Sequence, residues 1–149
     1  MQIKSKPRIL IIDDNASFRE LLRIMLSNEG YAVEVAEDAV EGGKAMLATQ
    51  PDLVICDIDM PFMDGLELLS ALRADPSIAS LKVILLSGRK DIDTLTKAEQ
   101  FGVLDYLIKP VTRERLLESV NACLKKADGG PIAAAAGRAP IAVVTTGSR

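Results

Sequence analysis

Five polar side chains that could carry out chemistry stand directly after short apolar runs. Near-continuous apolar runs are typical of parallel strands, which are covered on both faces of their sheet. If these runs belong to one parallel sheet, the polar side chains meet at its carboxyl edge, where open α/β sheets place their sites. Three acids, a hydroxyl and an amine at one edge suggest a carboxylate that is phosphorylated with the help of a divalent cation. The residues are Asp13, Asp14, Asp57, Ser87 and Lys109.

The turn after the first apolar run favours a bound cation over a bound nucleotide. It reads Asp13-Asp14-Asn15-Ala16-Ser17 and has no glycine, so its backbone cannot cradle a dinucleotide pyrophosphate. Two adjacent carboxylates repel each other and favour a cation, and hard oxygen ligands suit Mg²⁺. The pair could also simply cap the following helix. Because Asp57 ends another apolar run, capping alone is the weaker interpretation.

Amphipathic segments that favour helices alternate with the apolar runs. Apolar side chains at helical spacing between residues 18 and 26 predict the first helix. Ser17 and Glu20 are expected to form its capping box, and Gly30 suits its end. Four further helices are expected, and the fourth helix of the chain, at 91–101, is polar with few apolar residues. Their expected starts are Asp38, Asp64, Asp91 and Thr112.

The strand pattern predicts the order of the sheet. Residues 31–37 alternate, with larger side chains at Tyr31, Val33 and Val35 on one face and Ala and Glu on the other. This alternation is typical of a half-exposed edge strand. Five strand–helix units with right-handed crossovers form a doubly wound α/β fold. We therefore expect a five-stranded parallel sheet of order 2-1-3-4-5, in a flavodoxin-like three-layer sandwich, with its switch point between strands 1 and 3.

These motifs resemble the receiver domain of two-component response regulators. Asp13-Asp14, Asp57, Ser87 and Lys109-Pro110 occur in the order and spacing of that family, and residues 57–65 (DIDMPFMDG) are close to its phosphoacceptor signature. The resemblance extends from about Pro7 to Lys126. It implies that Asp57 accepts a phosphoryl group from a sensor histidine kinase or a histidine phosphotransfer protein.

The resemblance also implies a metal site. Asp14 and Asp57 are expected to bind Mg²⁺ directly, together with the backbone carbonyl of Asp59. Asp13 is expected to act mainly through a bound water. Asp59 itself is a departure, because it adds a carboxylate at a variable position where the family tunes the lifetime of the phosphoryl group, as it does at Arg89. This acid could orient water, repel phosphoryl oxygens or simply remain solvated.

The remaining motif residues are expected to read the phosphorylated state. Lys109 pairs with a phosphoryl oxygen and precedes a cis bond to Pro110, Ser87 donates a hydrogen bond to the phosphoryl group, and Tyr106 is the aromatic switch residue. Lys109 could instead be a solvated lysine, Ser87 a cap and Tyr106 plain packing. The surface formed by the fourth helix, fifth strand and fifth helix is expected to bind the downstream protein. The chain is expected to phosphorylate and dephosphorylate itself rather than turn over a substrate.

Composition limits the other possibilities. A net charge of −3 and a pI near 5.0 argue against direct nucleic-acid binding and anionic membrane surfaces. No apolar stretch is long enough for a signal peptide or membrane span, so a cytoplasmic location is expected. Only 3% of residues are aromatic, which predicts an aliphatic core. Cys56 and Cys123 are expected to be buried thiols rather than a disulfide.

The chain is expected to divide at residue 127. Residues 1–127 form the receiver domain, and residues 128–149 are an Ala/Gly/Pro-rich tail without an output domain, expected to be flexible. The tail could instead dock through Ile141–Val144 or be a linker of a longer regulator, which would make this chain a receiver fragment. Asp57-Ile58-Asp59 also matches the nucleophile motif of haloacid-dehalogenase-type phosphohydrolases, although the motif order is reversed here. A degenerate, scaffold-only receiver is a further alternative.

Overall fold

The computed structural model describes residues 6–88 and 91–126. Five parallel strands form one sheet of order β2-β1-β3-β4-β5, which confirms the predicted fold. Along the chain the elements are β1 (Arg8–Ile12), α1 (Ala16–Asn28), β2 (Ala32–Ala36), α2 (Ala39–Thr49), β3 (Leu53–Asp57), α3 (Gly65–Ala74), β4 (Val83–Ser87), α4 (Ile92–Gln100), β5 (Asp105–Ile108) and α5 (Arg113–Leu124).

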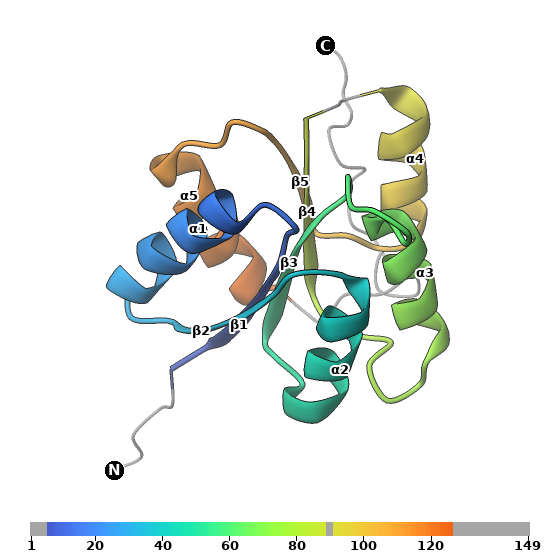
Figure 1. The fold of residues 1–149 in the computed structure, drawn as a ribbon, viewed down its shortest axis with the longest axis horizontal. Helices are drawn as coiled ribbons and strands as arrows, with labels where there is room; N and C mark the ends of the chain where they lie inside the picture. Colours follow the sequence, from blue (N-terminus) through green and yellow to red (C-terminus); the bar gives the residue numbers. More distant parts are fainter. Residues whose placement is uncertain (1–5, 89–90, 127–149) are drawn as a thin grey trace.

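The helices cover both faces of the sheet, which gives three layers (Figure 1). On one face, alternate strand residues pack against α1 and α5, in a core that includes Ile11, Ile55 and Leu116. On the other face, the intervening strand residues pack against α2, α3 and α4, as Leu10, Val54 and Leu69 do. The three central strands are buried on both faces because their apolar runs do not alternate. In the part of the chain that the structure describes, no helix is long and apolar enough to cross a membrane.

Side-chain caps start the helices, and four of the five predicted starts are confirmed. Asp38, Asp64, Asp91 and Thr112 each accept a hydrogen bond from the backbone N–H three residues later. The first start was wrong: Asn15, not Ser17, caps α1, with its side chain accepting from Phe18 N at 2.9 Å. Both residues have good capping side chains, but the Asp13 carboxylate also holds the Asn15 N–H, so the turn closes two residues earlier.

The edge strand β2 departs from its predicted pattern of faces. Tyr31 and Val33 pack against the α1/α5 side of the core, whereas Val35 is 44% exposed and Ala36 is buried. In the described part of the chain no strand lies beyond β2, so large side chains near its outer end are not fully covered. The two cysteines are buried and free, as predicted.

Candidate functional site

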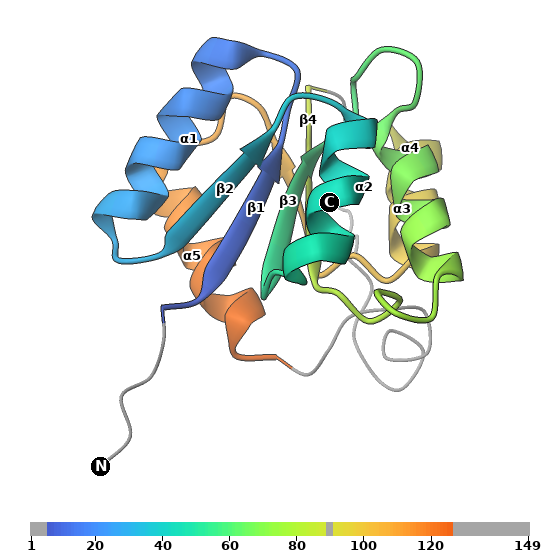
Figure 2. The same ribbon diagram turned by 60° about the horizontal axis from the view of Figure 1, so that its bottom comes forward.

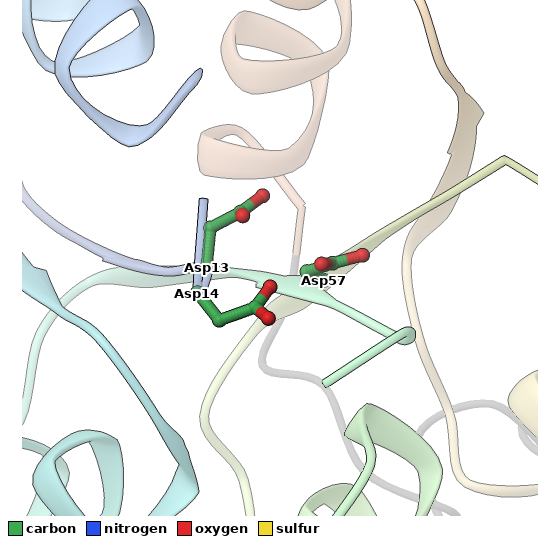
Figure 3. A group of neighbouring side chains, drawn as sticks. All are labelled: Asp13, Asp14 and Asp57. Atoms are coloured by element: carbon green, nitrogen blue, oxygen red, sulfur yellow. The ribbon is translucent and has the colours of Figure 1, made fainter. Parts of the chain in front are cut away.

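Three carboxylates gather where β1 and β3 end. Asp13 and Asp14 follow β1, and Asp57 is the last residue of β3. Ile12 pairs with Cys56 across the two strands, so the acids that follow lie side by side (Figure 3). One oxygen from each carboxylate lies within 4.8 Å of the others. The predicted convergence of these residues at the carboxyl edge is therefore found.

Lys109, which follows β5, brings a positive charge to these acids at the same edge of the sheet. Its Nζ lies 3.2 Å from Oδ2 of Asp13 and 3.3 Å from Oδ1 of Asp57. The same ammonium lies 4.6 Å from the centre of the Phe18 ring, within the range of a cation–π contact. Lys109 N donates to Ser87 O at 2.8 Å, and the Lys109–Pro110 peptide bond is cis, as the resemblance implied. Lys109 is thus fixed in place rather than solvated.

Local hydrogen bonds hold the two buried acids in position. Asp13 Oδ1 accepts from Asn15 N at 2.8 Å, and its carbonyl accepts from the Arg19 guanidinium at 2.6 Å. Asp57 Oδ1 accepts from Asp59 N at 3.1 Å. Asp13 and Asp57 are almost fully buried, whereas Asp14 is exposed. Each buried carboxylate therefore combines a backbone donor with the shared lysine.

The electrostatics of the site show an excess of negative charge. Burial raises the pKa of the Asp57 carboxyl to about 6, and the nearby charge of Asp13 adds to that effect while Lys109 opposes it. Burial alone would lower the pKa of Lys109, but the charges of Asp13 and Asp57 outweigh it, so its pKa is raised. Lys109 therefore stays protonated at neutral pH, and within the described residues this one cation faces the cluster of three acids.

The donor set fits a hard divalent cation. Asp13, Asp14 and Asp57 offer carboxylate oxygens, the ligands that Mg²⁺ prefers, and their spacing allows one ion to bridge them. Asp14 forms no ion pair within residues 6–88 and 91–126, so its carboxylate is available to a ligand. The acidic cluster agrees with the predicted metal ligands, and the Mg²⁺ assignment itself remains a prediction.

Ser87 contacts a residue that the sequence did not pair with it. Its side chain is fully buried at the end of β4, and its Oγ donates to Asp59 Oδ2 at 3.4 Å. Asp59 thus contributes its side chain to the site as well as its backbone. Residues 57 to 59 form a tight turn in which Asp59 N bonds Asp57, and this turn brings the Asp59 carboxylate towards β4.

Tyr106 lies inward. It is 7% exposed and belongs to the core on the α4 face, together with Leu85, Ala98 and Val103. Leu85 is its partner in the neighbouring strand, two residues before Ser87. The side chain therefore connects the strand that carries Ser87 with α4. Both interpretations, switch and packing, are compatible with this position.

The rim of the site is formed by the β3–α3 loop. Gly65, the first residue of α3, lies so close to β3 that an added Cβ would meet Asp57 O at 2.5 Å. Only glycine fits this approach without displacing the backbone. The capping box of Asp64 and Glu67 fixes the start of α3. Arg89, the domain boundary at residue 127 and the tail at 128–149, with its docking alternative, lie outside the described residues.

Comparison with known proteins agrees with this geometry. Residues 9–121 match the family model described as "Response regulator receiver domain". The transcriptional regulator RpaA of Synechocystis is 37% identical over 128 residues, which are 86% of this chain and 53% of RpaA. The response regulator MprA of Mycobacterium sp. strain KMS is 38% identical over 126 residues, covering 83% of this chain and 54% of MprA. The chain thus spans about half the length of the curated relatives that it matches.

The matched region covers nearly the whole length of solved structures with a similar fold. A response regulator receiver protein from Pseudomonas putida has a TM-score of 0.76 at 34% identity, covering 80% of this chain and 99% of that one. The chemotaxis protein CheY4 of Vibrio cholerae has a TM-score of 0.74 at 28% identity, covering 79% and 98%. The order of strands and helices described above is therefore that of a known and complete domain type.

Proposed function

Because the chain belongs to the response regulator receiver family, we propose that it is a phosphorylation-activated switch in two-component signalling, with Asp57 as the phosphoryl acceptor. One observation carries the proposal: at the carboxyl edge, Lys109 Nζ lies 3.2 Å from Asp13 Oδ2 and 3.3 Å from Asp57 Oδ1. A carboxylate is a weak nucleophile, so its reaction depends on positioning and on neutralising charge at phosphorus. Lys109 supplies positive charge beside Asp57, and the acidic cluster would supply more by holding a divalent cation.

The proposed step moves one phosphoryl group between two side chains. An Asp57 oxygen attacks the phosphorus of a phosphohistidine on a kinase or phosphotransfer protein; a P–O bond forms as the P–N bond breaks. The electron pair of the broken bond stays on the imidazole nitrogen of the donor. Lys109 Nζ, already 3.3 Å from Asp57 Oδ1, pairs with an oxygen of the transferred group. A water molecule later hydrolyses the aspartyl phosphate, which releases inorganic phosphate and restores the Asp57 carboxylate. We propose that the chain acts as a phosphoacceptor that phosphorylates and dephosphorylates itself rather than as a turnover enzyme.

The site is also proposed to require Mg²⁺. When bound, the ion would neutralise charge on the phosphoryl oxygens. Asp14 and Asp57 would hold it with the backbone carbonyl of Asp59, and Asp13 would orient a bound water. Asp13 is suited to the indirect role because both of its carboxylate oxygens already accept hydrogen bonds, from Asn15 N and Lys109.

Signal output is proposed to start at Ser87. Phosphorylation adds about −1.5 to −2 charges beside this hydroxyl, which then donates to a phosphoryl oxygen in place of Asp59. A hydrogen bond to a charged group contributes about 1.5–3 kcal/mol, and full inversion of a two-state population takes about 5.5 kcal/mol. The hydrogen bond supplies part of this free energy, and the added negative charge beside Lys109 supplies more, at about 4 kcal/mol for a charge pair about 4 Å apart at an effective dielectric near 20 before desolvation. The response passes through Tyr106 to the surface formed by α4, β5 and α5, where a downstream protein binds.

The proposed output is a protein contact, whether the domain acts alone or as part of a longer regulator. RpaA is described as DNA-binding, but that relative is about twice as long as the matched region. Net charge −3 supports protein binding rather than direct DNA binding by the receiver itself. A cytoplasmic location is also proposed, because the phosphodonor proteins of two-component systems act there.

Incubation with Mg²⁺ and acetyl phosphate, followed by intact mass measurement, tests the acceptor role. The wild-type chain should gain about 80 Da for one phosphoryl group, and Asp57→Ala should not. Hydrolysis of unrelated phosphate monoesters that is lost in Asp59→Asn would instead favour the phosphohydrolase alternative.

A further inference from the structure

Phe62 combines full exposure with an unusual backbone conformation. Its side chain is 103% exposed, and its φ angle is +69°. The left-handed region is uncommon for residues with large side chains and is strained for them. The phenyl ring therefore contributes nothing to the core, and a glycine or asparagine would fit the backbone better.

The other aromatic residues of the chain are packed. The sequence has three Phe, two Tyr and no Trp, and all five aromatic residues lie within the described residues. Phe62 is the only one of the five whose side chain is exposed. Beside it, Met63 is 40% exposed, so two large apolar side chains face solvent next to each other. The packed aromatic residues are Phe18, Tyr31, Phe101 and Tyr106.

The loop that carries Phe62 is braced. The capping box of Asp64 and Glu67 fixes its far end. A braced loop presents a side chain at little cost in conformational entropy on binding, which favours affinity. Its backbone hydrogen bonds run from Met60 N to Ile58 O (3.0 Å), from Met63 N to Pro61 O (2.8 Å) and from Gly65 N to Ile58 O (2.9 Å).

The position of the loop limits what can cover it. It runs from Asp57 to the start of α3 and stands beyond the carboxyl edge of the sheet (Figure 2). Any protein that brings a phosphohistidine into contact with Asp57 must lie across this rim. Phe62, five residues from the acceptor, is therefore placed within the contact surface that phosphoryl transfer requires.

The charges of the site make an apolar contact useful to such a donor. Within the described residues, Asp13 and Asp57 share one cation, Lys109, and the incoming phosphoryl group is itself negative. Affinity for the donor protein must then come from contacts beside the acids, and buried aromatic residues are frequent anchors of protein interfaces.

We propose that Phe62 is the anchor for the phosphohistidine-bearing donor protein, which buries this ring in an apolar hollow beside its histidine. Met63 extends the contact. The inference rests on the proposed acceptor function of Asp57. It adds a specificity element that acts on protein donors and leaves small phosphodonors unaffected.

The test compares two donors on the same full-length variants. The protein donor is the autophosphorylated histidine kinase or phosphotransfer protein that labels the wild type fastest in a panel, and the small donor is acetyl phosphate. Phe62→Gly should lower kcat/KM for the protein donor by about 10- to 100-fold, mainly through KM. Labelling by acetyl phosphate should stay within about twofold of wild type, since the site itself is unchanged.

Three variants act as controls. Phe62→Gly should fold at least as well as wild type because glycine accepts the positive φ, and a thermal melt checks this. Phe62→Leu, which retains an apolar side chain, should recover most of the transfer rate. Leu47→Ala removes another exposed apolar side chain (52%), on α2, and should transfer at the wild-type rate.

Several outcomes would overturn the inference. Equal protein-donor rates for Phe62→Gly and wild type would do so, as would an equal loss in Leu47→Ala. If acetyl phosphate labels Asp57 but no phosphohistidine protein in the panel labels the wild type, the proposed occupant is wrong. If acetyl phosphate itself fails to label the wild type, the acceptor function fails instead, so the two failures are distinguishable.

Discussion

The Ser87 hydroxyl donates to Asp59 Oδ2 across 3.4 Å. This is long for an O–H···O hydrogen bond and therefore weak, even though the acceptor is charged. A phosphoryl group on Asp57 would compete for the same proton at little cost. Asp59, which the sequence left as a solvated acid or as a group acting on the phosphoryl lifetime, thus has a specific partner when Ser87 is in this position.

Removing the Asp59 side chain should favour the phosphorylated form. In Asp59→Ala the Ser87 hydroxyl no longer has to give up its hydrogen bond to Asp59 before it binds a phosphoryl oxygen. The variant also removes one negative charge near the phosphoryl group. We expect the steady-state phosphorylated fraction with acetyl phosphate and Mg²⁺ to rise, with the ratio of phosphorylated to free chain increasing about 3- to 10-fold for a gain near 1 kcal/mol. Intact mass measurement reports this ratio.

Asp59→Asn separates the hydrogen bond from the charge. Its amide oxygen can still accept from Ser87, but it carries no charge. If the hydrogen bond dominates, Asp59→Asn should resemble wild type and only Asp59→Ala should gain. If the charge dominates, both variants should gain equally. A fall in the phosphorylated fraction in both would show that Asp59 supports phosphorylation, contrary to this expectation.

Asp57 should destabilise the metal-free protein at neutral pH. Its pKa is raised to about 6, first by burial and then by Asp13, while an unfolded Asp titrates near 4. Between these values the folded state binds more protons than the unfolded state, so the unfolding free energy falls as pH rises from about 4 to 6. The loss at pH 7.5 is on the order of 3 kcal/mol.

Asp57→Asn should remove this loss. In EDTA, the variant should be more stable than wild type at pH 7.5 by a margin that shrinks towards pH 4, as measured by urea denaturation. The difference between the two proteins isolates Asp57 from other titrating groups. A variant that is less stable than wild type at pH 7.5 would show that the Lys109 ion pair outweighs the burial of the charge.

Mg²⁺ should stabilise the folded protein through the same carboxylates. A ligand at ten times its Kd stabilises by about 1.4 kcal/mol, and the effect should weaken below pH 6, where Asp57 becomes protonated. Thermal melts with and without Mg²⁺ measure it. Asp14→Asn should abolish the shift without harming the fold, because Asp14 is exposed. Asp93→Asn, an exposed acid in the first turn of α4, should keep the full shift.

Arg73 is a structural residue that sequence reasoning missed. It lies near the end of α3, and burial lowers the pKa of its guanidinium to about 10. Instead of an acid, it binds backbone carbonyls that follow α3 and α4, and it forms no ion pair within the described residues. Its acceptors are Phe101 O (2.7 Å), Ala79 O (2.9 Å), Leu81 O (2.6 Å) and Gly102 O (3.2 Å).

Arg73→Met should therefore be strongly destabilising. It keeps the aliphatic stem but leaves these carbonyls without their donor, which costs about 3–5 kcal/mol on the scale of broken buried charged hydrogen bonds. Arg73→Lys should recover less than half, since an ammonium cannot span acceptors so far apart. Urea denaturation gives both values. A loss below about 1 kcal/mol in Arg73→Met would mean that water replaces the guanidinium.

Features set by nearby residues were predictable from the sequence. Asp64 with Glu67 forms its capping box, because both partners lie within one helical turn. The site acids converge because strand ends meet in any parallel sheet. Contacts decided by distant packing were not predictable. The carbonyls that Arg73 binds come from two loops, α3–β4 and α4–β5, and Ser87 and Asp59 belong to different strand ends. Val35 is exposed because, within the described residues, no strand lies outside β2.

Ser87 should couple phosphorylation to α4. This helix buries few residues, chiefly Thr94 and Ala98, and an element with little buried apolar surface can open or shift at low cost. Acetyl phosphate should therefore change amide hydrogen exchange in α4 and β5 of the wild type by more than about threefold in rate. Ser87→Ala should still be labelled at Asp57, because Lys109 remains in place, but the exchange in α4 should stay at its unphosphorylated value.

Tyr106→Leu keeps most of the buried volume and separates packing from switching. If Tyr106 transmits the change, this variant should also lose the response of α4. Its free energy of unfolding should stay within about 1.5 kcal/mol of the wild-type value. An unchanged response of α4 in both variants would place the coupling elsewhere than along Ser87 and Tyr106.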